Sequence, residues 1–431
     1  MGGQNGRRVA IVAGCRTPFA KSGTAFKDIS AVDLARLATR ELLVRSEIAP
    51  AEVDQVIFGQ VIPSVLAPNV AREVSLLPQF PKTIPAYSLN RACASSSQAV
   101  AAAHDQIALG QADVVVVGGT ESLSDIPILH SKRFAELLVQ ASKAKTLGER
   151  LRVLARTRLR DLVPVTPAIA EPSTGETMGQ SAEKMAKENG ISREAQDAYA
   201  LRSHQLAARG TADGRLTAEI APVFVPPAYD AVVTADNGIR ADSTLEQLAA
   251  LKPVFDRRYG SVTAANASPL TDGASAMLLM SGEAAQALGY TPLAYIRSYA
   301  VAAVDPGDQL LMGPAFAVPR ALERAGIAWK ELGLVEMHEA FASQVLSNIQ
   351  AFESDIWARD HLGRAERIGD VTRDTVNVMG GSIAIGHPFG ATGCRVTTTL
   401  ANEMRRRDVQ FGLISVCAQG GMGFAMILER R

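Results

Sequence analysis

The chain has 431 residues, of which 47% are hydrophobic and 20% are charged, the composition of a globular protein. This length predicts two or three structural units rather than one simple core. Lys+Arg and Asp+Glu both total 44, so no overall basic excess indicates a nucleic-acid binder. No apolar run approaches the roughly 20 residues that a membrane-spanning helix requires.

The first part of the chain alternates between strand and helix patterns. "VAIVAG" predicts a buried strand, and the periodic stretch after it predicts an amphipathic helix that begins at Ser30. "ADVVVVGG" is apolar on both faces and predicts a strand covered on both sides. Strands are expected at 9–14, 53–61 and 112–119, and helices at 30–46 and 96–110. Such alternation is typical of an α/β protein with covered sheets.

Beyond residue 122 the pattern changes. Strong buried strands are missing up to about residue 260, and helical stretches such as "GQSAEKMAKENGISREAQDAYALRSHQLAARG" take their place. Gly190 can end one of these helices and Ser192 can begin the next. We expect an inserted lobe across the top of the sheets, after which "GSVTAANASPLTDGASAMLLM" rejoins the first half.

The C-terminal part repeats the order of the first. A glycine-rich turn, a small-residue helix and a buried strand follow one another in "NVMGGSIAIGHPFGATGCRVTTTLANEMRRRDVQFGLISVCAQGGMG", as they do in "SLNRACASSSQAVAAAHDQIALGQADVVVVGGTES". This weak repeat indicates a duplication. The expected domains are an N-terminal half at 1–121 plus 262–290, an inserted loop domain at 122–261 and a C-terminal half at 291–431.

Four reactive side chains stand at junctions between expected elements. Cys93 directly precedes a helix, whose N–H groups and dipole would lower its pKa, although core packing is the commoner explanation of such a cysteine. Cys417 ends a strand before a glycine run that lets a ligand approach. His387 lies in a glycine-rich loop, and His338 lies at a strand-to-helix junction without the second histidine of a zinc motif. Together they favour nucleophilic catalysis.

The motifs around these residues resemble those of the thiolases along nearly the whole chain. They are "NRACASS", "GSVTAANASPLTDGA", "HEAFA", "GGSIAIGHPFGATG" and "CAQGGMG", in the family's order and spacing. The resemblance implies an α/β thiolase fold, a duplicated five-layer αβαβα core with an inserted loop domain. It is closer to the β-subunit of the fatty-acid-oxidation multienzyme complex, because many other thiolases carry asparagine where His338 stands. "RLRDLVPVTPAIAEPSTGETMG" also looks like that branch.

The resemblance implies a role for each reactive residue. Cys93 would hold the acyl group as a thioester, His387 would be the general base, and Cys417 the general acid and base. His338 and His387, directly or through a bound water, would form an oxyanion hole for the enolate, and the backbone N–H groups of Cys93 and Gln419 would form another. Gln419 stands where glycine is common, but the backbone donor remains. The implied activity is CoA-dependent thiolytic cleavage of 3-ketoacyl-CoA to acetyl-CoA and a shortened acyl-CoA in fatty-acid β-oxidation, with CoA as co-substrate and no metal.

By the same resemblance, CoA lies against the inserted lobe and the returning strand. Ser268 and Ala267 would contact the pantetheine arm, and Met178 and Gly179 would lie near its path. Short-chain thiolases often carry histidine where Thr177 stands, which weakens the case for short-chain specificity. The other histidines, at positions 104, 130, 204 and 361, are expected to take no part in catalysis.

A basic segment indicates a partner surface. Residues 131–160 contain nine Lys/Arg and two Asp/Glu, and their apolar residues recur at helical spacing. They predict two basic amphipathic helices broken near Gly148, which suit an anionic membrane surface or an acidic partner. A solvated face over the insertion, or attraction of CoA phosphates, explains the pattern equally well. The resemblance favours a partner, since in the multienzyme branch this region lies near the hydratase/dehydrogenase α-subunit and the membrane.

Other functions remain open at this stage. The same residues would serve a short-chain acetoacetyl-CoA thiolase in the biosynthetic direction, and an inactive scaffold or lipid-binding subunit is a candidate from another class. Ketoacyl synthases share the fold but lack a second cysteine like Cys417. The family resemblance implies a homodimer or a dimer of dimers. The four cysteines show no metal-type or disulfide pattern, so a reducing, cytoplasmic location is expected, with peripheral membrane contact as the alternative.

Overall fold

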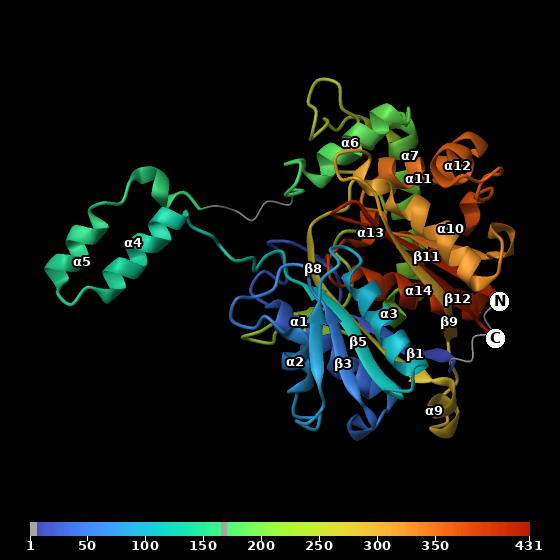
Figure 1. Cartoon of the computed structure of the whole chain (residues 1–431), viewed down its shortest axis with the longest axis horizontal. Helices are drawn as coiled ribbons and strands as arrows, with labels where there is room; N and C mark the ends of the chain where they lie inside the picture. Colours follow the sequence, from blue (N-terminus) through green and yellow to red (C-terminus); the bar gives the residue numbers. More distant parts are fainter. Residues whose placement is uncertain (1–6, 165–169) are drawn as a thin grey trace. The chain divides into compact units, whose positions relative to one another are not determined.

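The computed structural model describes residues 7–164 and 170–431 (Figure 1). The chain divides into two compact units, one made of Met1–Asp125 and Glu171–Arg431 and the other of Ile126–Ala170. We call them the main body and the hairpin unit. Among the described helices, none is both long and apolar enough to cross a membrane.

The main body is built on a ten-stranded sheet with the order β10-β11-β12-β9-β1-β8-β5-β3-β4, in which β2 pairs beside β8. Its strands are β1 (Val9–Arg16), β2 (Ala20–Lys21), β3 (Gln55–Gly59), β4 (Ala86–Leu89), β5 (Val114–Glu121), β8 (Thr271–Ser281), β9 (Ala294–Ala303), β10 (Leu334–Met337), β11 (Phe411–Ala418) and β12 (Met422–Glu429). A small separate sheet joins β6 (Val223–Phe224) to β7 (Val232–Val233). The strands predicted at 9–14, 53–61 and 112–119 are confirmed as β1, β3 and β5.

The strand pairing displays the expected duplication. In the first half β3 pairs with β5 in parallel, and β5, β8 and β1 follow in antiparallel pairs. In the second half β10 pairs with β11 in parallel, and β11, β12 and β9 follow in antiparallel pairs. Even β4, parallel to β3, has a counterpart in the parallel bridge between Val335 of β10 and Val376. The antiparallel pair of β1 and β9 joins the halves.

Helices cover both faces of each half. They are α1 (Ala31–Ser46), α2 (Val70–Ser75), α3 (Ser95–Ala108), α6 (Met178–Glu188), α7 (Arg193–Ala212), α8 (Leu245–Ala249), α9 (Gly282–Ala287), α10 (Gly313–Ala325), α11 (Ala342–Phe352), α12 (Asp355–Leu362), α13 (Ser382–Ile385) and α14 (Thr392–Arg407). On the outside, α1 and α2 pack on the first half and α10 on the second. Between the halves, α3 contacts β3 and β5 while α14 contacts β10 and β11, which gives the five layers.

The two central helices approach each other very closely. A Cβ atom on Gly393 of α14 would lie 2.3 Å from the backbone nitrogen of Ser97 in α3, so only glycine fits there. Cys394 N–H also donates to Ser96 Oγ at 3.0 Å. This contact fixes the start of α14 against the start of α3, and both helices begin next to residues predicted to be functional.

The segment between the first half and β8 is mainly helical, as predicted. Ser192 caps α7 by accepting a hydrogen bond from Ala195 N–H at 3.2 Å, which confirms the predicted helix start. The helices α6 and α7 pack against α11 and α13 of the second half. Residues 171–261, expected to form a loop domain together with 122–170, thus belong to the same compact unit as the two halves.

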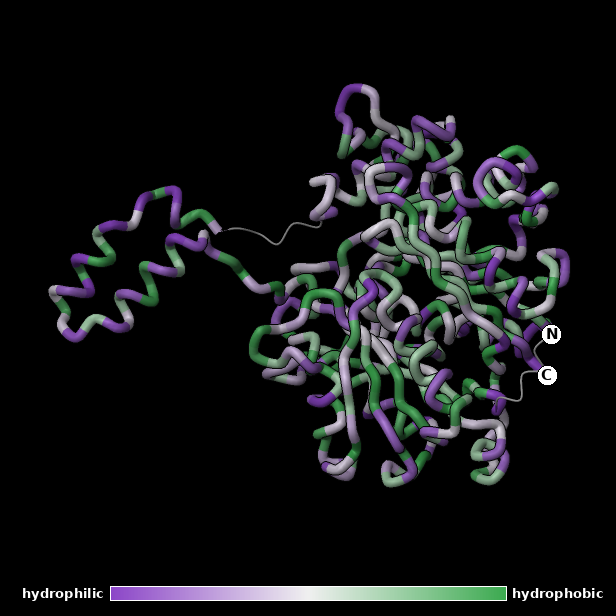
Figure 2. Tube along the Cα trace, in the orientation of Figure 1, coloured by the Kyte–Doolittle hydropathy of each residue, from purple (hydrophilic) through white to green (hydrophobic). Residues whose placement is uncertain are grey.

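The hairpin unit consists of α4 (Lys132–Lys143), α5 (Leu147–Leu154) and a short 3-10 turn at Leu159–Leu162. Figure 2 shows polar and apolar residues alternating along both helices. The two predicted helices are confirmed, but the break falls at 144–146, where Thr146 forms a capping box with Glu149. Gly148 lies within α5. An ion pair between Arg133 and Asp161 ties α4 to the final turn.

Candidate active site

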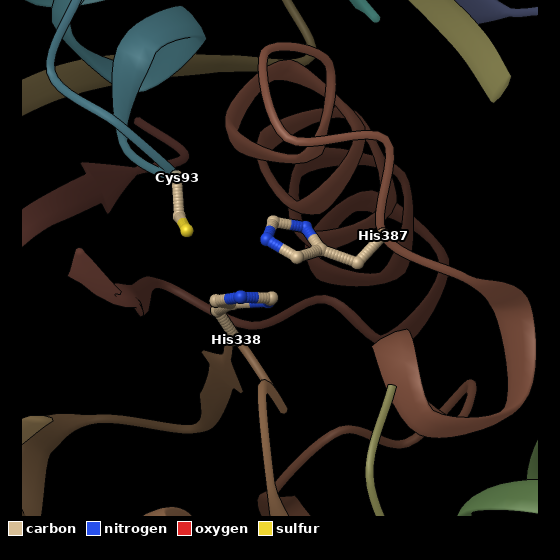
Figure 3. Close-up of side chains that lie close together, drawn as sticks. All are labelled: Cys93, His338 and His387. Carbon is tan, nitrogen blue, oxygen red and sulfur yellow. The ribbon is translucent and has the colours of Figure 1, made fainter. Parts of the chain in front are cut away.

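Three of the residues predicted to be functional converge at one point of the main body. The Sγ atom of Cys93 and one ring nitrogen each of His338 and His387 all lie within 4.8 Å of one another. The two imidazole rings have centroids 4.1 Å apart and planes inclined by 46°. Figure 3 shows the thiol of Cys93 directed toward both rings. Residues from both duplicated halves therefore form a single site.

Cys93 is presented by a tight turn between β4 and α3. Ala92 has a φ of 45°, a left-handed conformation that alanine rarely adopts. The turn is held by Asn90 Oδ1, which accepts from Ala92 N–H at 2.8 Å, and by Ser95 Oγ, which donates to the Ala92 carbonyl at 2.6 Å. Backbone strain of this kind concentrates at functional sites, which favours a functional interpretation of Cys93 over core packing.

The Cys93 thiol is protonated in the free site. Burial raises its pKa to about 12, and hydrogen bonds from the backbone of Gln419 and of Cys93 itself offset only part of the rise. The expectation of a lowered pKa is therefore wrong, because the desolvation of a thiolate outweighs the backbone hydrogen bonds that favour it. Cys93 needs a base to become a nucleophile.

His387 has the geometry of that base. Its Nδ1 lies 2.6 Å from Oγ1 of Thr392, whose hydroxyl is within donating distance of the Pro388 carbonyl at 3.2 Å. If the threonine proton goes to Pro388, its oxygen accepts from Nδ1–H of His387, and Nε2 keeps its lone pair. Burial, followed by the charge of Arg395, lowers the pKa of His387 to about 3, so the ring is neutral. Its Nε2 has no hydrogen-bond partner among the described residues.

His338 follows β10 and is fully buried. Its Nδ1 lies 3.0 Å from Oγ of Ser382, and its Nε2 has no partner within the described part of the chain. Burial lowers the pKa of His338 well below its ordinary value, and the positive charge of Arg395 adds to the effect. A neutral imidazole with an unpaired nitrogen in a dry site can stabilise an oxyanion.

Cys417 and Gln419 lie where β11 ends. Burial, and then the proximity of Cys93, raise the pKa of Cys417 well above its ordinary value, so this thiol also keeps its proton. The backbone of Gln419 hydrogen-bonds to Cys93, as expected for an oxyanion-hole donor. The following residue, Gly420, donates its N–H to Oε2 of buried Glu171 at 2.9 Å. No sequence pattern singles out Glu171, because its partner is distant along the chain.

Glu121 is a second residue that sequence patterns did not single out. It ends β5, is fully buried and accepts backbone N–H bonds from Val61, Ile62 and Gly390, each at 3.0 Å. Burial raises its pKa to about 7 despite these donors. The hydrogen bond from Gly390 N–H to this carboxylate holds the loop that carries His387. An acid at the end of a wholly apolar strand was the available signal.

The expected CoA contacts fall beside a cationic cavity. Ser268 N–H donates to the Ala340 carbonyl at 2.9 Å, and Ala267 forms a bridge with Phe341, so this loop runs along "HEAFA". A cavity of about 350 Å³ next to the loop is lined by Lys21, His204, Arg240, Ala264, Ala265 and Pro269, among others. Ile383 of α13 also lines it and connects it to the active-site loop. His204, expected to be purely structural, thus faces this cavity.

Met178 and Gly179 begin α6, capped by Thr177, and do not line that cavity in the described structure. Gly179 packs on the ring of Phe255, where a Cβ would lie 1.9 Å from the ring. Phe255 in turn lies edge-on to Phe341, with ring centroids 6.2 Å apart. The start of α6 therefore approaches the "HEAFA" loop through two aromatic rings.

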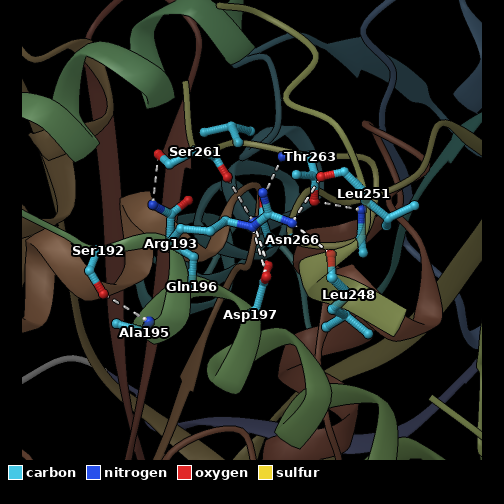
Figure 4. Close-up of polar contacts among 12 residues, drawn as sticks. Ser192, Arg193, Ala195, Gln196, Asp197, Leu248, Leu251, Ser261, Thr263 and Asn266 are labelled. Atoms are coloured by element: carbon cyan, nitrogen blue, oxygen red, sulfur yellow. Dashed lines mark hydrogen bonds and ion pairs between the residues drawn. The ribbon is translucent and has the colours of Figure 1, made fainter. Parts of the chain in front are cut away.

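A partly buried ion pair and its hydrogen bonds hold Thr263 and Asn266, just before Ser268 in the chain (Figure 4). Arg193 Nε pairs with Asp197 Oδ2 at 2.7 Å, and its Nη2 donates to the Leu248 carbonyl at 2.6 Å. Asn266 Nδ2 donates to Asp197 Oδ1 at 2.9 Å, and Asn266 Oδ1 accepts from Thr263 N–H at 2.8 Å. The start of α7 thus fixes the loop that precedes the expected CoA contacts.

The cluster of Cys93, His338 and His387 has donor atoms of the kind that zinc binds. The donor atoms are close enough together to share one ion. That the protein holds no resident metal remains a prediction. The three groups can also act without a metal as a thiol, a base and an oxyanion donor.

Both halves of the chain match the models of one protein family. The thiolase N-terminal domain matches residues 9–283 and the thiolase C-terminal domain matches residues 290–430. Proteins named 3-ketoacyl-CoA thiolase from Yersinia enterocolitica and Yersinia pestis are each 52% identical over 426 residues, which is 99% of this chain and 98% of theirs.

Solved structures agree in fold. The acetyl-CoA acetyltransferase of Bacillus anthracis is 36% identical with a TM-score of 0.84, and the match covers 99% of this chain and 100% of that one. Human mitochondrial 3-ketoacyl-CoA thiolase, also solved in complex with CoA, is 34% identical with a TM-score of 0.82 over 98% of both chains. The duplicated five-layer fold, the convergent cysteine and histidines, and these matches along both halves show that the chain belongs to the thiolase family.

Proposed function

We propose that this thiolase cleaves 3-ketoacyl-CoA with CoA, releasing acetyl-CoA and an acyl-CoA shortened by two carbons, in the degradative direction of fatty-acid β-oxidation. The enzyme is an acyltransferase and CoA is its co-substrate. The observation that carries the proposal is the convergence of the Cys93 thiol on one ring nitrogen each of His338 and His387. The Nε2 atoms of both rings have no hydrogen-bond partner among the described residues. The names of the relatives that are 52% identical support the substrate class.

The first half-reaction forms an acyl-cysteine. His387 Nε2 removes the proton of Cys93 as its sulfur attacks the keto carbon, and backbone N–H groups of Cys93 and Gln419 receive the oxyanion. The bond between C2 and C3 then breaks, and its electron pair forms the enolate of acetyl-CoA. His338 donates a hydrogen bond to the enolate oxygen while the thiol of Cys417 protonates C2. The proton held by His387 passes to Cys417 and restores its thiol.

The second half-reaction transfers the acyl group to CoA. His387 removes the proton of the CoA thiol, whose sulfur attacks the thioester carbon. The tetrahedral intermediate collapses, the Cys93 sulfur leaves and takes back the proton from His387, and the shortened acyl-CoA departs. Because the pKa of Cys93 is raised to about 12 and that of His387 is lowered to about 3, a resting thiolate–imidazolium pair is disfavoured. Proton transfer therefore accompanies attack on bound substrate.

The cationic cavity supports a position for the phosphates of CoA. Lys21 and Arg240 both line it, and ammonium and guanidinium groups are the usual partners of phosphate. The neighbouring alanines, Ala264 and Ala265, leave an apolar path toward Ser268 and the active-site loop. We propose that the nucleotide end of CoA binds at Lys21 and Arg240, with the pantetheine arm passing Ala267 and Ser268.

Oligomer formation is supported by the edge strand β4. It ends the sheet, and its four residues are all only partly buried. An edge strand left uncovered pairs readily with another chain. We propose a homodimer in which two copies meet at this edge, with a dimer of dimers as the larger assembly.

The hairpin unit supports attachment to an acidic surface. The nine Lys/Arg of 131–160 accompany apolar side chains that remain exposed, including Leu147 at 72% and Leu151 at 59%. Basic residues beside exposed leucines are typical of helices that lie in an anionic membrane interface. We propose peripheral binding of a cytoplasmic enzyme to anionic lipid, with a hydratase/dehydrogenase α-subunit of β-oxidation as the alternative occupant.

The first experiment compares CoA-dependent cleavage of acetoacetyl-CoA and 3-ketohexadecanoyl-CoA by the wild-type enzyme and by Cys93→Ala. Faster turnover of the long substrate, lost in the variant, is the expected result. Preference for acetoacetyl-CoA would instead indicate the short-chain, biosynthetic enzyme. The similarity to an acetyl-CoA acetyltransferase makes this the alternative to test. No cleavage of either substrate by folded protein would contradict the proposal and favour a scaffold subunit.

A further inference from the structure

Two side chains in the first turn of α14 support the two active-site histidines, one directly and one through another residue. Thr392 and Arg395 are three residues apart at the start of this helix, so their side chains share one face. Thr392 hydrogen-bonds directly to His387, whereas Arg395 reaches His338 through Ser382. Both supporting side chains are buried, Thr392 fully and Arg395 with 1% exposed.

Thr392 and Ser382 offer different hydrogen-bonding groups to the two rings, an acceptor to His387 and a donor to His338. Thr392 donates its hydroxyl proton to Pro388, so its oxygen is an acceptor for Nδ1–H of His387. The oxygen of Ser382 accepts from Arg395 Nη2 at 2.9 Å. Its hydroxyl proton is then free to point at Nδ1 of His338, 3.0 Å away. His338 would consequently carry its proton on Nε2, while His387 would carry its proton on Nδ1.

The burial of Arg395 requires an explanation that packing does not supply. A buried guanidinium is costly, and here Nε and Nη1 have no hydrogen-bond partner among the described residues. Glu336 Oε2 lies 3.9 Å from Nη1 and offers only a long ion pair. The hydrogen bond to Ser382 is the close polar contact that Arg395 makes, and guanidinium nitrogens can only donate. Arg395 therefore fixes the direction of the serine hydroxyl.

We propose that Arg395 and Ser382 are positioning residues that hold His338 in the Nε2–H tautomer, which makes it a hydrogen-bond donor to the enolate oxygen. Thr392 holds His387 in the opposite tautomer, with a lone pair on Nε2 for proton abstraction. Two histidines with touching rings are thereby assigned different tasks by two side chains of one helical turn. This inference rests on the proposed thiolase reaction, and it explains why His338 and His387 take different roles in it.

The test separates the two half-reactions. Exchange of labelled CoA with a saturated acyl-CoA uses Cys93 and His387 but forms no enolate, whereas thiolysis of a 3-ketoacyl-CoA forms one. Ser382→Ala is expected to lower kcat of thiolysis about 10- to 100-fold, the usual effect of removing a hydrogen bond behind a functional histidine, with exchange within about 2-fold of wild type. Arg395→Gln is expected to repeat this pattern, and the double variant to be no slower than either single variant.

Thr392→Val provides the contrast, because it is expected to lower exchange and thiolysis together. Thr397→Val removes another buried hydroxyl of α14, which donates to the Gly393 carbonyl at 2.8 Å, and is expected to leave both reactions unchanged. Thermal unfolding of each variant establishes that it is folded. If Arg395→Gln does not fold, Ser382→Ala alone decides.

Equal losses of exchange and thiolysis in Ser382→Ala, or no loss of either, would overturn the assignment. A wild-type enzyme without thiolysis would refute the proposed function instead, so the two failures are distinguishable.

Discussion

The rings of His338 and His387 lie with centroids 4.1 Å apart, yet their Nδ1 atoms contact hydroxyl groups in different surroundings. Both rings are neutral, because burial lowers both pKa values. Neither ring can therefore be distinguished from the other by charge, and the hydrogen-bond partner behind each ring has to decide its role. Cys93 and Cys417, both protonated, complete a site in which every group starts without charge.

Replacing Cys417, the proposed proton donor, should slow thiolysis without slowing the exchange of CoA. Cys417→Ala removes the thiol that protonates C2, so thiolysis is expected to fall about 10²- to 10⁴-fold while exchange of labelled CoA with acyl-CoA persists. The control is Cys394→Ala, which removes a fully buried thiol of α14 that has no place in the proposed reaction. A loss of exchange in Cys417→Ala equal to the loss of thiolysis would contradict the role as proton donor to the enolate.

The raised pKa of Cys93 predicts how the free enzyme reacts with iodoacetamide. With a pKa of about 12, the thiolate fraction should increase about tenfold for each pH unit between about pH 6 and 9, and the alkylation rate should follow it. Mass spectrometry of the modified cysteine assigns the rate to Cys93. A plateau that begins near about pH 6 would mean that a thiolate–imidazolium pair exists at rest.

Glu121 should make the folded state less stable as the pH rises. Its folded pKa of about 7 exceeds the ordinary value of 4.5, so the folded protein retains this proton where the unfolded chain has lost it. The favourable contribution is fully present below about pH 4.5 and is lost as the pH rises through about 7, a change of up to about 3 kcal/mol. Glu121→Gln should remove this part of the pH dependence.

Urea unfolding of wild type and Glu121→Gln at several pH values in that window measures the difference. The amide also places an NH₂ group toward backbone N–H groups, so the variant should be less stable overall by about 1 to 3 kcal/mol. Identical pH slopes in the two proteins would show that Glu121 is already ionised in the folded state.

Arg240 is expected to contribute to CoA affinity rather than to turnover. Arg240→Gln removes a charge from the cavity beside Ser268 and should raise KM for CoA about 10-fold with little change in kcat. Arg209→Gln, in a different cationic cavity lined also by Arg202 and Arg407, is the matched control. Steady-state kinetics with CoA as the varied substrate provides the measurement. An unchanged KM in Arg240→Gln would place the phosphates elsewhere.

The hairpin unit should bind vesicles through its charge. Replacing Lys143, Lys145 and Arg152, which are all exposed, with glutamate should abolish sedimentation with vesicles that contain anionic phospholipid and leave kcat unchanged. The same replacement of Lys330, Arg359 and Arg364, exposed on the main body, should leave binding intact. If the wild-type protein does not bind anionic vesicles but binds a purified hydratase/dehydrogenase, the alternative partner is established.

The amino-acid pattern was sufficient wherever the deciding interactions are local. Ser30 and Ser192 cap their helices because a side-chain oxygen meets an N–H group three residues on. β5 was predicted to be covered on both faces, and all eight of its residues are buried. The repeated order of turn, helix and strand reappears as the matching strand orders of the two halves. The motifs also pointed to Cys93, His338 and His387, whose side chains converge in the structure.

What only the tertiary structure decided depends on partners far apart along the chain. The pKa of Cys93 rises rather than falls because burial, which no local pattern reveals, outweighs the backbone hydrogen bonds from Gln419 and Cys93. The contacts of Glu121 with Gly390 and of Ser382 with His338 form only when segments far apart along the chain meet. The sequence by itself determined the fold class and the family, and it predicted four reactive side chains, three of which lie together in the structure. The contact of His338 with Ser382, 44 residues away, is one that only the packed core makes, and the proposed roles of the two histidines depend on it.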